Sequence, residues 1–150
     1  MSNQRIVLTD TDHERLEQLM FRAGHPRNTL DAVAFQRLSR ELGRARIVPP
    51  ERVPPDVVTL QSVARVRDKE TGECMRVEVS WPEDADPQVG RINVLAPLGM
   101  ALLGARAGHH IEWPMPSGRR RLYVEAVLFQ PEREGRDIAA SAMAAEPSLA

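Results

Sequence analysis

The sequence predicts an α+β protein with a helical hairpin first and a β-sheet with one short helix second. Two early stretches repeat apolar residues at helical spacing, whereas the chain from residue 57 onward alternates apolar and polar residues. A proline-rich segment separates these two textures. We therefore expect a hairpin over 1–48, a linker over 49–56, a sheet domain over 57–131 and a mobile tail over 132–150.

Composition narrows the range of functions. The chain has 150 residues and a net charge of −1, so it has no overall cationic field and any contact with nucleic acid must be local. Cys74 is the only cysteine, which excludes an intrachain disulfide and is typical of a reducing compartment. The sequence contains neither a secretion signal nor a stretch long enough to span a bilayer. We expect a cytoplasmic protein without a membrane partner.

The first predicted helix begins at Thr11, because Thr11 and Glu14 have the spacing of a capping box. A short extended segment, Ile6–Leu8, precedes it. Its apolar stripe consists of Leu16, Leu19, Met20 and Ala23. Gly24 ends the helix.

The second predicted helix is capped by Asn28 or Thr29. Its apolar stripe consists of Leu30, Ala34, Phe35, Leu38 and Leu42. The short connection predicts that the two helices lie antiparallel and cover each other's stripes. Prolines at 49, 50, 54 and 55 then favour a stiff, extended linker.

The sheet domain is predicted to begin with a β-hairpin. Val57–Arg67 is rich in β-branched residues, Asp68–Glu73 resembles a turn, and apolar residues alternate from Met75 to Trp81. A further strand runs from about Gly108 to Met115, and residues 116–118 turn the chain. The last strand, Arg119–Phe129, is partly apolar on both faces, which favours an interior position.

The stretch Gly90–Gly104 combines a strand, a helical turn and a glycine stop in one apolar run. Pro97 suits the first turn of a helix because it has no N–H to leave unpaired, and Gly104 and Gly108 allow the chain to reverse. The residues expected in the core are Val94, Leu98, Ala101 and Leu102. Whether its exposed edge also contacts a partner is left open by this pattern.

No catalytic motif is present, so we expect a protein that is not an enzyme and needs no cofactor or metal. Adjacent positions on a strand point to opposite faces, so His109 and His110 cannot chelate a metal together. The remaining isolated candidates are expected to be structural or solvated, namely Cys74 as a small apolar residue, His13 and His25 at the surface, and Asp84 and Asp86 in a loop. The basic run Arg119, Arg120 and Arg121 fits either a phosphate or acidic partner or a solvated hairpin end.

The run Gly90–Gly104 and the strand Ile111–Pro114 resemble the C-terminal domain of the bacterial Gre transcript-cleavage factors. Within that family the resemblance is closer to the Rnk group, through Ile6–Thr9, Pro55–Leu60 and Leu128–Glu132. The likeness covers residues 6 to about 132. It implies an FKBP-like C-terminal domain and an N-terminal antiparallel coiled coil.

The resemblance also implies a function. Gre factors bind RNA polymerase at the rim of its secondary channel, and the matching contact residues here are Leu95, Ala96 and Pro97, with Asn93 beside them. Gre cleavage uses acidic residues at the coiled-coil tip to help hold a magnesium ion. The tip here, Gly24–Asn28, is neutral to basic, and Asp31 is the nearest carboxylate. Because a catalytic metal needs closely placed carboxylates, we expect a polymerase-binding regulator without cleavage activity.

Two other functions are considered. An FKBP-like fold suggests a prolyl isomerase, which would need an aromatic pocket built from Trp81, Trp113, Tyr123 and Phe129. A nucleic-acid-binding module, including a DNA-binding one, would use the three consecutive arginines 119–121.

Overall fold

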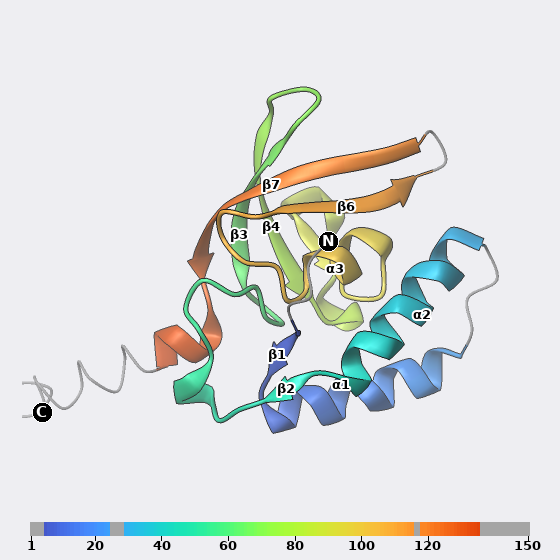
Figure 1. Cartoon of the computed structure of the whole chain (residues 1–150), viewed down its shortest axis with the longest axis vertical. Helices are drawn as coiled ribbons and strands as arrows, with labels where there is room; N and C mark the ends of the chain where they lie inside the picture. The colour runs from blue at the N-terminus through green and yellow to red at the C-terminus, as the bar shows by residue number, and fades with distance from the viewer. Residues whose placement is uncertain (1–4, 25–28, 116–117, 136–150) are drawn as a thin grey trace, which may run out of the picture.

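The computed structural model describes residues 5–24, 29–115 and 118–135 (Figure 1). Its centre is a five-stranded sheet in the order β5-β4-β3-β7-β6. The strands are β3 (Val63–Asp68), β4 (Cys74–Ser80), β5 (Arg91–Asn93), β6 (His110–Met115) and β7 (Gly118–Phe129). Helix α3 (Pro97–Leu102) packs against β4, β5 and β6. The predicted α+β class is confirmed, and among the described helices none is long and apolar enough to cross a membrane.

Both predicted N-terminal helices are present, as α1 (Asp10–Ala23) and α2 (Thr29–Gly43). They lie beside the sheet in Figure 1. Two short strands, β1 (Val7–Leu8) and β2 (Arg46–Ile47), pair in parallel at the open end of this module. The sequence did not predict β2. Helix α2 packs mainly against α3, so the two helices do not simply cover each other.

Helix α1 begins earlier than predicted. Its N-cap is Thr9, whose Oγ1 accepts a hydrogen bond from the Asp12 N–H at 3.2 Å, so the predicted start at Thr11 is wrong. Asp10 and Asp12 then lie in the first turn, and the exposed Asp10 is the one whose negative charge interacts favourably with the helix dipole. Gly24 ends α1 as predicted, with a φ of +67°. The cap candidate Asn28 and the tip residues 25–28 lie outside the described residues.

The helical module and the sheet share one hydrophobic core. Leu16 of α1 and Leu38 of α2 belong to the same buried cluster as Val66 of β3 and Leu122 of β7. The linker packs against the rest of the protein and is not an extended spacer between two separate modules. Residues Pro50–Arg52 form a 3-10 turn and Val53 is fully buried, so the predicted extended linker is wrong at this point.

The predicted hairpin of β3 and β4 is confirmed as an antiparallel pair. The predicted start of its first strand at Val57 is wrong, because β3 begins at Val63. The prediction of an antiparallel sheet is wrong for β5, which runs parallel to β4, with Val79 opposite Ile92. A tight hairpin cannot connect parallel strands, so the chain must return along the sheet before pairing again. It does so through two 3-10 turns, Pro82–Asp84 and Pro87–Val89, each of which begins with a proline.

Strand β7 lies between β3 and β6, which confirms its predicted interior position. Two register shifts interrupt the pairing of β7 with β3, so the side chains of β7 do not alternate between the faces along its whole length. Arg65 pairs with Ala126 whereas the next residue of β3, Val66, pairs with Val124, so Glu125 is the extra residue. Beyond the bulge, Val127 packs against the core.

The start of the predicted tail belongs to the fold. Residues 131–135 form a helical turn directly after β7. The fully buried Gln130 side chain donates hydrogen bonds to the carbonyls of Pro54 and Val57, at 2.7 and 2.8 Å. These bonds attach the end of the sheet to the linker, and residues 136–150 lie outside the described residues.

Candidate functional site

The four residues predicted to contact a partner lie in one turn, Asn93–Pro97, which we call the docking edge. The Asn93 side-chain oxygen accepts from the Leu95 N–H at 2.9 Å, and the Asn93 carbonyl accepts from the Ala96 N–H at 2.9 Å. Ala96 is the N-cap of α3 and forms no side-chain cap bond, and Pro97 occupies the first turn as predicted. Local hydrogen bonds therefore fix the shape of the turn.

The docking edge is only partly buried. Val94 is fully buried, whereas Leu95, Ala96 and Pro97 are half-buried and present apolar groups to solvent. Met100 and Leu102 of α3 are buried beneath the turn. The buried residues of this segment anchor it to the core, and its half-buried residues form an apolar surface at the end of β5.

The close approach of α3 to β5 depends on Gly99. A Cβ atom at this position would lie 2.1 Å from the Asn93 carbonyl oxygen and 3.0 Å from the Val94 Cα. Both neighbours are backbone atoms, which cannot rotate away as a side chain would. No local sequence pattern reveals this role of Gly99, because it depends on where α3 lies relative to β5.

The three consecutive arginines do not form one surface. The Arg120 guanidinium forms an ion pair with the buried Asp68, whereas Arg121 is exposed and Arg119 donates to Glu112 at 3.2 Å. Successive side chains of a strand point to opposite faces, which explains the separation. A joint phosphate contact of Arg119, Arg120 and Arg121, one of the two roles considered for this run, would therefore lack its middle residue.

The aromatic side chains of the sheet domain are dispersed. Trp81 is buried and its ring lies 3.9 Å from the Arg15 guanidinium, whereas Phe129 is exposed. Trp113 is half-buried against the core, and the Tyr123 ring lies beside His110 with a centroid separation of 5.0 Å. None of these four aromatic residues lines either of the two pockets described below.

Two isolated predictions are corrected. His13 is not a freely exposed residue, because its Nε2 lies 2.9 Å from the Leu42 carbonyl oxygen and links α1 to the end of α2. Cys74, predicted to be a small apolar residue, is exposed at the start of β4, and its Sγ lies 3.8 Å from Glu125 Oε1. His25 lies outside the described residues. Within the described ranges, no three His, Cys, Asp or Glu side chains are grouped so that they could hold a metal ion.

A groove of about 790 Å³ lies between α1 and α2. Met20, Phe21, Phe35 and Leu42 contribute apolar lining. Phe21 is 89% exposed, which is unusual for a large aromatic side chain and gives the helical module an apolar surface of its own. Phe21 lies outside the apolar stripe predicted for this helix, so the helical pattern does not identify it.

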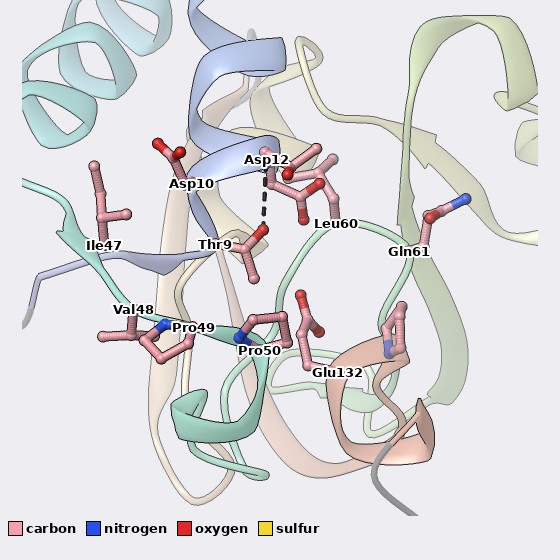
Figure 2. A pocket seen from close by; sticks show the side chains of 12 residues that line it. Thr9, Asp10, Asp12, Ile47, Val48, Pro49, Pro50, Leu60, Gln61 and Glu132 are labelled. Atoms are coloured by element: carbon pink, nitrogen blue, oxygen red, sulfur yellow. Dashed lines mark hydrogen bonds between the residues drawn. The ribbon is translucent and has the colours of Figure 1, made fainter. Parts of the chain in front are cut away.

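A second pocket, of about 650 Å³, lies where the start of α1 meets the linker and the helical turn at 131–135. Figure 2 shows Asp12 from α1 and Glu132 from that turn directed toward the same space. Glu132 is nearly buried, and its Oε1 accepts a 2.8 Å hydrogen bond from the Thr59 hydroxyl. Two carboxyl groups far apart in the sequence therefore face each other across this junction.

Burial of its carboxyl group and the negative charge of Glu132 raise the pKa of Asp12 from 3.8 to about 6, against the opposing effect of Arg15. The folded protein therefore keeps a proton on Asp12 up to a higher pH than the unfolded chain does. Because the folded state binds more protons, the contribution of Asp12 to stability falls as the pH rises from about 4 to above 6.

Replacement of Asp12 by Asn should therefore raise the melting temperature near pH 8, where wild-type Asp12 is charged, and lose that advantage near pH 4. Thermal melts monitored by circular dichroism at both pH values test this. Asp10→Asn is the matched control, because it removes an exposed carboxylate from the same turn and should give no gain at pH 8. An Asp12→Asn effect that is the same at both pH values would contradict the assignment.

Two family descriptions match separate parts of the chain. Residues 53–129 match the family described as transcription elongation factor, GreA/GreB, C-term, and residues 4–48 match the Rnk N-terminus. The chain belongs to the GreA/GreB family. The docking edge lies within the first of these matches, and the hairpin of α1 and α2 lies within the second.

Individual members of the GreA/GreB family are similar to this chain over most of its length. The chain is 36% identical over 139 residues to the regulator of nucleoside diphosphate kinase of Escherichia coli K12, covering 90% of this chain and 97% of the relative. It is 26% identical over 114 residues to GreA of a Sulfurovum species, covering 76% and 70% of the two chains. A solved GreA/GreB factor from Nitrosomonas europaea superimposes with a TM-score of 0.71 at 36% identity, covering 85% of this chain and all of that one. The resemblance to the Rnk group is confirmed.

Proposed function

We propose that this chain is a non-enzymatic, cytoplasmic transcription regulator that binds RNA polymerase near the rim of its secondary channel. The docking edge supplies the contact, with Leu95, Ala96 and Pro97 against the polymerase and Asn93 holding the turn. In this proposal the sheet domain is FKBP-like, and the hairpin is a shortened form of the Gre coiled coil.

The observation that carries this proposal is the position of the docking edge in the GreA/GreB match. The turn combines half-buried apolar side chains with a hydrogen-bonded backbone, so little conformational entropy is lost when a partner covers it. The exposed Phe21 on the hairpin offers a second apolar contact for the same partner.

The proposal excludes transcript cleavage because the hairpin tip lacks the acids that such chemistry needs. Residues 24–31 contain a single carboxylate, Asp31. One carboxylate is a weak ligand set for a catalytic magnesium ion, which needs several oxygen ligands in a defined geometry. A regulator of this kind would act by occupying the site that a cleavage-competent Gre factor uses.

Backtracked elongation complexes test the proposal. Excess protein alone should leave the transcript intact, and it should lower Gre-stimulated cleavage in proportion to its concentration. An unrelated protein at the same concentration is the control and should have no effect. Cleavage by this chain alone would refute the non-enzymatic part, and undiminished Gre-stimulated cleavage would refute binding at the rim.

A further inference from the structure

The sheet has an arginine-rich outer face. Its inner face carries the core residues Ala64, Val66, Val77 and Val124. The side chains at the alternating positions point outward. On the outer face they include Arg65, Arg67, Arg76, Arg91, Arg119 and Arg121, together with Glu78, Glu112 and Glu125. Although the chain has a net charge of −1, basic residues predominate on this surface of the sheet, which we call the outer face.

The six arginines of the outer face outnumber its three glutamates, which form ion pairs with Arg65, Arg67, Arg91 and Arg119. Glu125, at the bulge of β7, lies between Arg65 and Arg67 and forms an ion pair with each. Arg65 and Arg67 remain about half exposed, at 50% and 51%, whereas Glu125 is only 16% exposed. The guanidinium groups are therefore the more accessible partners, and the surface that a ligand meets is positive.

A tyrosine lies in the middle of this surface. Tyr123 of β7 pairs with Arg67 of β3 on one side and with His110 of β6 on the other. The Tyr123 and His110 rings are 5.0 Å apart at an angle of 50°, and the Lys69 ammonium lies 6.0 Å from the Tyr123 ring. A row of one guanidinium and two rings thus crosses three adjacent strands.

We propose that the outer face binds single-stranded nucleic acid, with the arginines on phosphates and an unpaired base stacked at Tyr123 and His110. An aromatic platform on an open sheet, surrounded by basic side chains, suits a strand whose bases are free to stack. An acidic protein would use the charges but would have no need of the ring pair. This inference is independent of polymerase binding, because it uses the face of the sheet and not the docking edge.

Fluorescence anisotropy with a labelled 20-nucleotide RNA of mixed sequence, and with the matching DNA strand and duplex, tests the proposal. The triple variant Arg67→Gln, Arg76→Gln, Arg121→Gln should bind at least about tenfold more weakly, with a log–log salt slope lower by about 2, because each lost phosphate contact removes about 0.7. Tyr123→Leu should weaken binding about tenfold with an unchanged salt slope, because it removes stacking alone.

The matched control is Arg22→Gln, Arg37→Gln, Arg40→Gln, which removes the same charge from exposed positions on the helices and should change affinity less than twofold. Melting temperatures of all variants establish that they are folded. No binding of the wild type at low salt would overturn the proposal, as would an equal loss in the control. Duplex binding as tight as single-strand binding, or complete displacement by polyglutamate at equal charge, would overturn it in favour of a general anionic partner.

Discussion

Gly99→Ala should lower the free energy of unfolding by about 3 kcal/mol, near the top of the usual range for overpacking. The added Cβ would lie 2.1 Å from the Asn93 carbonyl oxygen, so α3 and the end of β5 must move apart. That movement breaks contacts of Met100 and Leu102 with the core and displaces the docking edge. A thermal melt should show a fall of about 10 °C for a chain of this length.

Gly43→Ala is the matched control, because Gly43 is also a helical glycine but has no atom within 4 Å of an added Cβ. It should be neutral or stabilising by up to about 1 kcal/mol, since Ala is the better helix former. If Gly99→Ala melts like the wild type while Gly43→Ala behaves as expected, α3 does not lie against β5 as described.

Local signals predicted much of the fold. Pro97 at the start of α3 and Gly24 at the end of α1 each act through their own backbone, so their roles can be recognised without knowing the tertiary structure. The alternation that predicted the β3–β4 hairpin is also local, because neighbouring strands joined by a turn pair with each other. These elements are present, although β3 begins at Val63 and not at Val57.

The features that were missed depend on partners far along the chain. Strand β2 exists because it pairs with β1, and the turn at 131–135 is held in part by Thr59, far earlier in the chain. The bulge at Glu125 follows from pairing with β3, which the pattern of β7 alone cannot reveal. Patterning along one segment contains no information about such pairings.

The candidate site also has features that local patterns predict and features that depend on distant parts of the chain. The apolar run of residues 90–104 was enough to predict a turn and helix with a partly exposed edge, and the structure has both. Neither the contact of Gly99 with Asn93 nor the pairing of Arg120 with Asp68 could be read from spacing. Both arise where two elements meet in space.

Ala96→Arg should weaken binding to RNA polymerase at least about tenfold, as expected for a residue at the centre of an interface. Ala96 has a φ of −76° and a ψ of 151°, which any residue can adopt, and its side chain makes no cap bond. A long charged side chain can therefore be added at the docking edge while the fold is retained. It would force a partner to bury a charge against an apolar surface.

Val89→Arg adds the same side chain nearby, at a position that is 64% exposed and outside the docking edge. It should bind as the wild type does, within about twofold, because a charge change outside an interface core has little effect on affinity. Comparison of these variants separates loss of the contact surface from a general change in charge.

The most direct test is the equilibrium affinity of core RNA polymerase for the wild type, Ala96→Arg and Val89→Arg, measured in one titration series. We expect the wild type and Val89→Arg to bind alike and Ala96→Arg to bind at least about tenfold more weakly. Absence of wild-type binding, or equal binding of all three proteins, would contradict the proposed docking edge.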